Sequence, residues 1–232
     1  MATVALSGII TPSNVVTASS TTTLTNKTLT APTIASANLT TALTLAGAAG
    51  TNGQVLTSAG SGLPSWATVS AGFTLGTPVP TTSGTSIDFT GIPAGTKQIV
   101  ISFVSVSTNG SSGYLIQIGD SGGVETTDYL SMTVYFATGG TAQFENRTIG
   151  YENKVNFNSG SGTIVSGSIT LTLENSTAFS WVATGILFNT SVKECSFNAG
   201  NKSLSAVLDR VRITTVGGTD TFDAGEINIA YI

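Results

Sequence analysis

The charges of this chain are confined almost entirely to its C-terminal two thirds. Lys27 is the only ionisable side chain before Asp88, so all 12 Asp and Glu residues and all but one of the 8 Lys and Arg residues lie from Asp88 onwards. Between the two regimes, residues 47–72 are rich in Gly, Ser, Ala and Thr, carry no charge and hold one large aromatic side chain, Trp66. This change predicts two kinds of structure, an N-terminal arm (1–46) and a C-terminal head (73–232), joined by a junction (47–72).

Composition excludes several classes of protein. The net charge is −4 and basic residues are sparse, which argues against nucleic acid as a partner because phosphate binding needs clustered Lys and Arg. Apolar runs are too short to insert into a membrane, and MATVALSGII lacks the positive start of a signal peptide. Cys195 is the only cysteine and His is absent, so we expect no intrachain disulfide, no zinc site and no cofactor.

The arm has an unusual spacing of its apolar residues. Leu24, Leu29, Ile34 and Leu39 recur every five residues, which fits neither a helix nor a single strand. The high Thr content favours extended backbone. One such chain cannot bury its apolar side chains by itself, whereas several copies wound around a shared axis can. The alternative is a flexible Ser/Thr-rich linker.

Both ends of the chain resemble one family. TLTNKTLTAPTI, followed by GTNGQVLTSAGSGLPSWAT, resembles the shaft and pre-head segments of tailed-bacteriophage tail-fibre proteins. GIPAGTKQIVISFVSVSTNGSSGYLIQIGDSGGVETTDY and SLSAVLDRVRITTVGGTDTFDAGEINIAYI resemble a C-terminal head module of phage tail-fibre and receptor-binding proteins. The resemblance implies a homotrimer in the virion tail, with the arm docked on other tail or baseplate proteins.

The head has the pattern of an all-β domain. Short apolar or alternating runs are separated by Gly-rich turns at the spacing of a β-sandwich or barrel, and no amphipathic helix is evident. We expect a β-sandwich of jelly-roll type. The predicted strands are Ile87–Phe89, Gln98–Ser107, Tyr114–Ile118, Leu130–Phe136, Ile149–Phe157, Ile169–Leu173, Trp181–Phe188, Leu204–Val216 and Ile227–Ile232.

Two motifs invite a catalytic or metal-binding interpretation. Gly119-Asp120-Ser121-Gly122-Gly123 matches the surroundings of a serine-protease nucleophile, but without a His no general base can activate Ser121. We expect a loop in which Asp120 accepts hydrogen bonds from local backbone N–H groups. Asp220, Asp223 and Glu226 can offer oxygens to Ca²⁺ or cap a turn, and their spacing favours the turn.

Tyrosines between residues 114 and 151 suggest a binding surface. This segment carries four of the 5 Tyr residues, and a Tyr ring stacks on a sugar face while its hydroxyl forms hydrogen bonds. The alternative is that these rings pack within strands. The predicted receptor-binding residues are Tyr114, Tyr129, Tyr135, Arg147 and Tyr151.

These observations predict an attachment protein without enzymatic activity. The arm would dock on the virion and the head would bind a glycan or protein of the host surface. Three alternatives remain: a capsid decoration or head-fibre protein, a polysaccharide-depolymerising tailspike with two catalytic carboxylates, and a bacterial adhesin.

Overall fold

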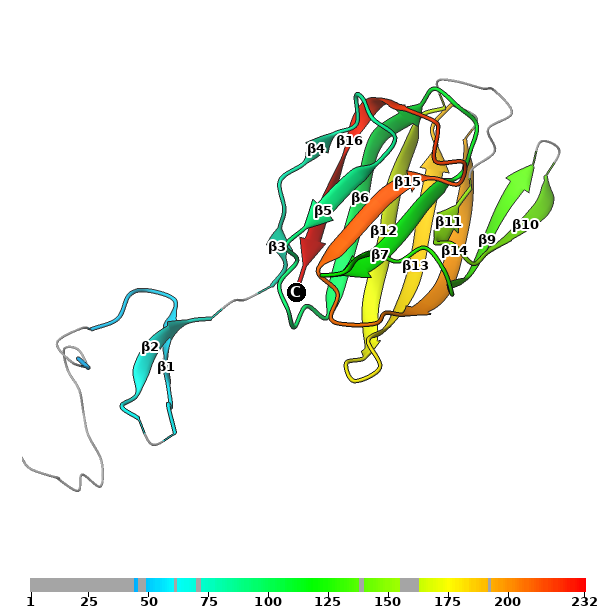
Figure 1. Cartoon of the computed structure of the whole chain (residues 1–232). Coiled ribbons are helices and arrows are strands. Elements are labelled where there is room, and N and C mark those ends of the chain that lie inside the picture. The colour runs from blue at the N-terminus through cyan, green and yellow to red at the C-terminus, as the bar shows by residue number, and fades with distance from the viewer. Residues whose placement is uncertain are drawn as a thin grey trace, which may run out of the picture. The chain divides into compact units, whose positions relative to one another are not determined.

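A computed structural model of the chain describes residues 44–45, 49–60, 62–69, 72–137, 140–154, 163–191 and 193–232. The predicted arm, 1–46, lies outside the described residues except for positions 44 and 45. The chain divides into two units between Val69 and Ser70 (Figure 1). Each unit is described below by itself.

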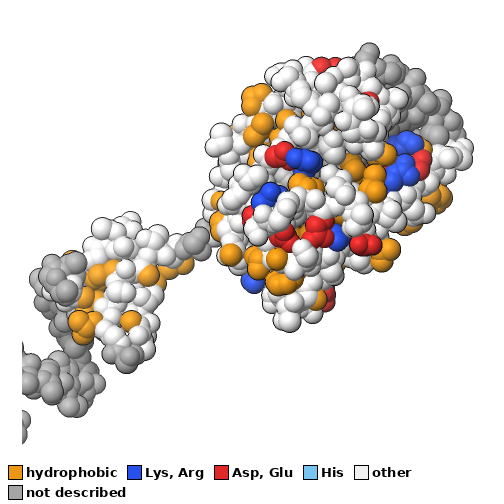
Figure 2. Space-filling view, viewed as in Figure 1, with side chains coloured by type: hydrophobic (Ala, Val, Ile, Leu, Met, Phe, Trp, Pro, Cys, Tyr) orange, Lys and Arg blue, Asp and Glu red, His pale blue; other side chains and the backbone are white. Residues whose placement is uncertain are grey.

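The N-terminal unit is built on one antiparallel hairpin. Strand β1 (Gln54–Thr57) pairs with β2 (Ser65–Thr68), with Leu56 opposite Trp66. The indole of Trp66 lies against the backbone of Gly50, where a Cβ would come within 2.7 Å of the ring. Figure 2 shows hydrophobic and uncharged side chains on this unit, whereas the charged side chains lie on the other.

The C-terminal unit consists of two antiparallel sheets. The larger sheet has the order β10-β9-β14-β13-β12-β6-β16-β3, with β4 also paired to β16. Its strands are β3 (Thr74–Leu75), β4 (Val79–Pro80), β6 (Gln98–Thr108), β9 (Leu130–Ala137), β10 (Thr141–Arg147), β12 (Val165–Asn175), β13 (Ser180–Asn189), β14 (Glu194–Ser203) and β16 (Phe222–Tyr231).

The smaller sheet has the order β11-β7-β15-β5, with β8 paired to β7. It comprises β5 (Ile87–Thr90), β7 (Tyr114–Asp120), β8 (Gly123–Val124), β11 (Tyr151–Asn153) and β15 (Arg210–Thr215). The described residues contain no helix, so the fold is all-β.

One hydrophobic core lies between the two sheets. Alternate residues of each strand face inwards, because successive side chains of a strand point to opposite sides. Ile99 and Ile101 of the larger sheet and Ile116 and Ile213 of the smaller sheet are all fully buried in this core. The smaller sheet therefore covers the larger one as the second layer of a β-sandwich (Figure 1).

The two layers differ in width. The smaller sheet ends at β11, which contacts β9, β10 and β14 of the larger sheet. The hairpin of β9 and β10 forms the edge of the larger sheet beyond that point (Figure 1). Near this edge the inward-facing side chains are polar, as the buried Ser131, Thr133, Ser196 and Asn198 show.

Most predicted strands are present, with three corrections. Strands β10 and β14 were not predicted, because ECSFNAGNKS has no β-branched residue and TAQFENR has only Thr141. The single strand expected over Leu204–Val216 is wrong in its first half, since β15 begins at Arg210. The strand expected over Ile149–Phe157 is limited to β11 among the described residues, and residues 155–157 lie outside them.

Candidate functional site

Three of the five predicted receptor-binding residues lie inside the head. Tyr114, Tyr129 and Tyr151 have no exposed surface. The Tyr129 and Tyr151 rings meet edge to face with centroids 5.0 Å apart, and the Tyr114 ring meets Phe103 at 5.7 Å. A buried ring offers no face to a ligand, so the prediction that these three tyrosines bind a receptor is wrong for this fold.

Each buried hydroxyl has a backbone partner, which explains how the core holds a Tyr. The Tyr129 hydroxyl accepts a hydrogen bond from the Ile118 N–H at 2.8 Å and donates to the Glu125 carbonyl at 3.0 Å. Ile118 lies beyond the part of β7 that β11 covers, so its N–H is available. The Tyr151 hydroxyl donates to the Trp181 carbonyl at 3.2 Å, and burial raises the pKa of both phenols.

The other two predicted residues, Tyr135 and Arg147, belong to one group of partly exposed side chains. The β9–β10 register places Tyr135, Glu145 and Arg147 on the same side of the hairpin. Glu152 of β11 and Lys154 just after it complete the group. We call these five residues the polar cluster.

Ion pairs connect the members of the polar cluster. Arg147 Nε lies 2.8 Å from Glu152 Oε2, and Arg147 Nη2 lies 3.3 Å from Glu145 Oε2. Lys154 Nζ donates to Glu145 Oε1 at 2.8 Å and lies 5.2 Å from the centroid of the Tyr135 ring. The Glu145, Arg147 and Lys154 side chains are a little over one quarter exposed, whereas that of Glu152 is 2% exposed.

The pKa values of the two carboxylates in the polar cluster are shifted in opposite directions. The hydrogen bond from Lys154, with the charges of Lys154 and Arg147, lowers the pKa of Glu145. Burial raises the pKa of Glu152 despite the neighbouring Arg147. Opposed shifts are typical of a glycosidase acid and nucleophile, but the Glu152 carboxylate is covered and held by Arg147. A substrate at the surface cannot reach it in this arrangement.

The polar cluster is better suited to binding than to catalysis. Two carboxylates and two cations give a neutral array that offers hydrogen-bond acceptors and donors side by side. A sugar presents the same mixture through adjacent hydroxyls, and the Tyr135 ring adds a partly exposed aromatic surface. The cluster therefore has the chemistry of a glycan-contacting surface.

Lys154 is the member of the polar cluster that the sequence analysis did not single out. Glu152 and Lys154 are two residues apart, as are Glu145 and Arg147, so each pair faces one side of an extended chain. Pairs of opposite charge at this spacing are the signal that could have identified the cluster. The sequence does not show that the two segments meet.

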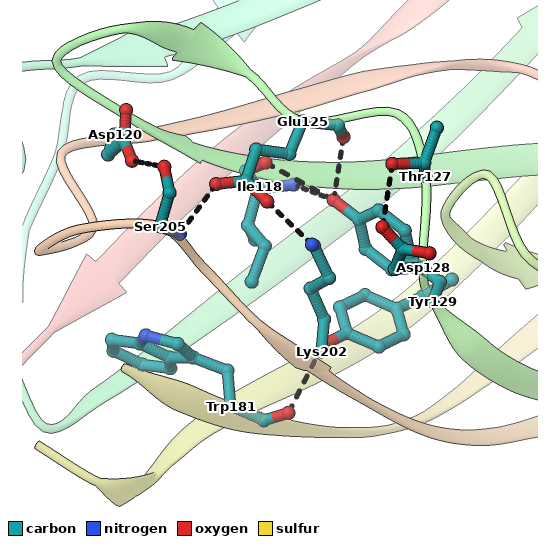
Figure 3. A network of polar contacts seen from close by, with 10 residues as sticks. Ile118, Asp120, Glu125, Thr127, Asp128, Tyr129, Trp181, Lys202 and Ser205 are labelled. Carbon is teal, nitrogen blue, oxygen red and sulfur yellow. Dashed lines mark hydrogen bonds and ion pairs between the residues drawn. The ribbon is translucent and has the colours of Figure 1, made fainter. Parts of the chain in front are cut away.

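Hydrogen bonds and an ion pair connect the Gly119–Gly123 loop and the segment after it to the end of β14 and the loop that follows (Figure 3). Asp120 accepts hydrogen bonds from the Gly122 N–H at 2.7 Å and from the Ser205 hydroxyl at 2.6 Å. Glu125 accepts the Ser205 N–H at 2.7 Å and pairs with the buried Lys202. The predicted hydrogen bond from a local backbone N–H to Asp120 is confirmed, and these contacts give the loop a structural role.

The acidic residues around the start of β16 also join neighbouring segments. Asp220 accepts the Ser112 N–H at 2.9 Å, and Asp223 forms a hydrogen bond with the Ser107 hydroxyl. Among the described residues, no group of three or more His, Cys, Asp or Glu side chains is arranged to hold a metal ion. Both partners come from distant segments, so these contacts differ from the local backbone hydrogen bonds that the turn interpretation predicts.

Comparison of the chain with known proteins finds no relative. No protein-family model, no curated protein and no solved structure matches the chain. In the part of the chain that the structure describes, no helix is long and apolar enough to cross a membrane.

Proposed function

We propose that this chain is a bacteriophage tail-fibre protein that assembles as a homotrimer and attaches the virion to its host. The N-terminal arm would dock on tail or baseplate proteins, and the head would contact a surface glycan. The proposal includes a fibrous arm and a jelly-roll-like head, both expected from the sequence. The resemblance of the shaft and head segments to tail-fibre proteins suggests the function.

The observation that carries the proposal is that the described residues of the N-terminal unit form no buried core. Its described residues form one two-stranded hairpin, and an isolated hairpin of this kind is at best marginally stable in water. Leu63 is 86% exposed, and Val55, Leu56 and Val69 are each nearly half exposed. Other copies of the chain can bury these side chains, as a fibre does.

The polar cluster supports the assignment of host binding to the head. It combines the half-buried Tyr135 with cations and carboxylates at the edge of the larger sheet. A single weak contact of this kind is sufficient in a multivalent particle, because each further head binds at high effective concentration. In the enzymatic alternative, a depolymerising tailspike, the polar cluster would supply the two catalytic carboxylates.

Two measurements test the proposal. Sedimentation of the full chain at micromolar concentration should give three times the mass of one chain, and a monomer mass would contradict the assembly. Electron microscopy of virions labelled with antibody against the head should place it on the tail. Label on the capsid would instead identify a decoration protein, and release of sugars from host polysaccharide would identify a tailspike.

A further inference from the structure

The outer face of the larger sheet carries a row of apolar side chains near its β10 edge. The register aligns Phe144 of β10 with Val134 of β9, Val134 with Phe197 of β14, and Phe197 with Ile186 of β13. The core residues alternate with these positions along β13, so the row points away from the sandwich core. Met132 and Phe188 lie beside the row on the same face. We call these six residues the outer apolar face.

The outer apolar face is large for the surface of a monomer. Met132, Phe188 and Phe197 are between 41% and 45% exposed, Ile186 is 50% exposed and Phe144 is 63% exposed. With about 200 Å² of accessible surface for each side chain, these five leave on the order of 500 Å² of apolar area. That value is near the upper end for the largest patch of a monomer, and the uncharged residues around it extend the face towards the ~800 Å² that a specific interface buries per partner.

The face is also free of charge. The outward positions of the described residues in β9, β10, β13 and β14 are occupied by apolar, Ser, Thr, Asn and Cys side chains, without Asp, Glu, Lys or Arg. The charged residues of β10, Glu145 and Arg147, point to the opposite side. The hairpin is therefore apolar on its outer face and charged on its inner face.

We propose that the outer apolar face is where copies of the head pack against one another. Identical copies bring identical charges, so an uncharged face avoids the like-charge repulsion that a face with charges of one sign would create at a self-contact. Homo-oligomeric interfaces are also more apolar than other surfaces. The six side chains of the face offer no hydrogen-bonding group to a host glycan, and the face offers no cation to an anionic membrane, whereas the polar cluster on the inner face provides both.

This inference rests on the proposed assembly and assigns the head its own share in it. If the arms associate, they hold the heads at high effective concentration, so a modest apolar contact is enough to bring the heads together. In a threefold assembly the rows would face the common axis, and each head would meet both neighbours. In a twofold assembly the same face would meet itself.

The only cysteine is a natural reporter for this contact. Cys195 lies on β14 opposite Phe188, on the same side as Phe197, and its thiol is free and partly exposed in one copy of the chain. Packing of copies at the outer apolar face would cover it. A maleimide should therefore react with Cys195 slowly in the assembled protein.

The test uses the full chain with Phe197→Glu at the centre of the row. Its control is Val104→Glu on β6, which is 51% exposed and lies outside the outer apolar face. We expect Phe197→Glu to accelerate maleimide labelling of Cys195 at least tenfold and Val104→Glu to leave it unchanged. Thermal melting and circular dichroism of each variant check that the head remains folded, and Ile186→Glu repeats the test at a second position.

The possible outcomes separate this inference from the proposed function. A trimer mass with rapid labelling of wild-type Cys195, or with slow labelling that persists in folded Phe197→Glu and Ile186→Glu, would overturn the inference and leave the trimer intact. A dimer mass with slow labelling that Phe197→Glu relieves would support the inference and contradict the trimer. A monomer with rapid labelling would overturn both.

Discussion

Lys202 and Glu125 form an ion pair of 2.5 Å in which the lysine side chain is only 4% exposed and the glutamate side chain 22%. The lysine ammonium also lies 5.5 Å from the centroid of the Tyr129 ring. The pair joins the end of β14 to the segment after β8, next to the Asp120–Ser205 hydrogen bond (Figure 3). A cation at this depth depends on its partner for neutralisation.

We therefore expect removal of Glu125 and removal of Lys202 to reduce stability by different amounts. Glu125→Gln should lower the free energy of unfolding by about 3–5 kcal/mol, because it leaves the buried Lys202 ammonium without a counter-charge. Lys202→Met should cost less, about 1–3 kcal/mol, since the Glu125 carboxylate retains the Ser205 N–H and some solvent. Urea unfolding at one fixed protein concentration measures both.

The exposed pair of Arg212 and Asp88 is the control for this comparison. Their side chains are 38% and 39% exposed, so Arg212→Met should change the unfolding free energy by no more than about 1 kcal/mol. Equal losses for Arg212→Met and Glu125→Gln would show that burial does not set the strength of these pairs. The double variant Glu125→Gln, Lys202→Met should lose less than the sum of the single losses.

Gly225 is a position where the backbone of the larger sheet leaves no room for a side chain. It has φ +88° at an irregularity in the pairing of β16 with β6, and a Cβ would lie 2.3 Å from the carbonyl oxygen of Ser105. Gly225→Ala should destabilise the head by about 2–5 kcal/mol through the left-handed backbone and the clash.

Gly91→Ala is the control, because Gly91 has φ +72° with nothing within 4 Å of a Cβ. A loss of about 1–2 kcal/mol there would isolate the cost of the conformation, and similar losses at both positions would contradict the clash.

Alternation of apolar residues predicted the all-β class and the core strands of the head. It worked for β6 and β13, where a buried residue stands at every second position over most of the strand, and for Ile169 and Leu171 in the middle of β12. It failed for β14, whose inward residues Ser196, Asn198 and Lys202 are polar and face β11 and its surroundings instead of the apolar core. A sequence pattern cannot show that a polar residue is buried when its partner comes from a distant strand.

The candidate site was predictable only in part for the same reason. The pattern that predicts a sugar-stacking Tyr does not distinguish Tyr135, which is partly exposed, from Tyr114, Tyr129 and Tyr151, which pack within the head. The partners of the buried hydroxyls are backbone groups such as the Ile118 N–H, which an uncovered stretch of β7 leaves available. That stretch is a property of sheet topology and leaves no trace in local sequence.

Acid should weaken the loop network around Asp120. The Ser205 hydroxyl and the Gly122 N–H donate to this carboxylate and lower its pKa. A carboxyl whose folded pKa lies below the unfolded value of ~3.9 stabilises the fold above that value, and the contribution is lost as the pH falls through the folded pKa. Asp120→Asn should therefore destabilise the head at pH 6–7 by about 1–3 kcal/mol.

The pH profile distinguishes this effect from a general loss of packing. The difference in unfolding free energy between wild type and Asp120→Asn should shrink as the pH is lowered below ~4, because the carboxyl is protonated first in the unfolded chain and then, at lower pH, in the folded protein. Measuring the difference removes the opposite contribution of Glu152, whose pKa is raised by burial and is common to both proteins. A difference that stays constant from pH 3 to pH 7 would contradict the role of the charge.

Host adsorption and stability should respond to different tyrosines. Tyr135 is partly exposed beside Lys154, so Tyr135→Ala should reduce adsorption of the virion while the melting temperature of the head changes little. The loss per site should be one or more kcal/mol, and simultaneous engagement of several heads multiplies it into a large decrease in adsorption. Adsorption assays with isogenic phage measure the first effect and thermal unfolding the second.

Tyr151 provides the matched control because it is fully buried and its hydroxyl donates to the Trp181 carbonyl. Tyr151→Phe should lower the unfolding free energy by about 1–3 kcal/mol by leaving that carbonyl unpaired. Tyr151→Ala should lower it by about 3–5 kcal/mol through the cavity.

At a temperature where Tyr151→Phe remains folded, its adsorption should equal that of wild type. If Tyr135→Ala adsorbs normally, the polar cluster does not contact the host. If Tyr151→Phe adsorbs poorly while fully folded, the host contact depends on the interior of the head, and the binding surface must be sought near Trp181.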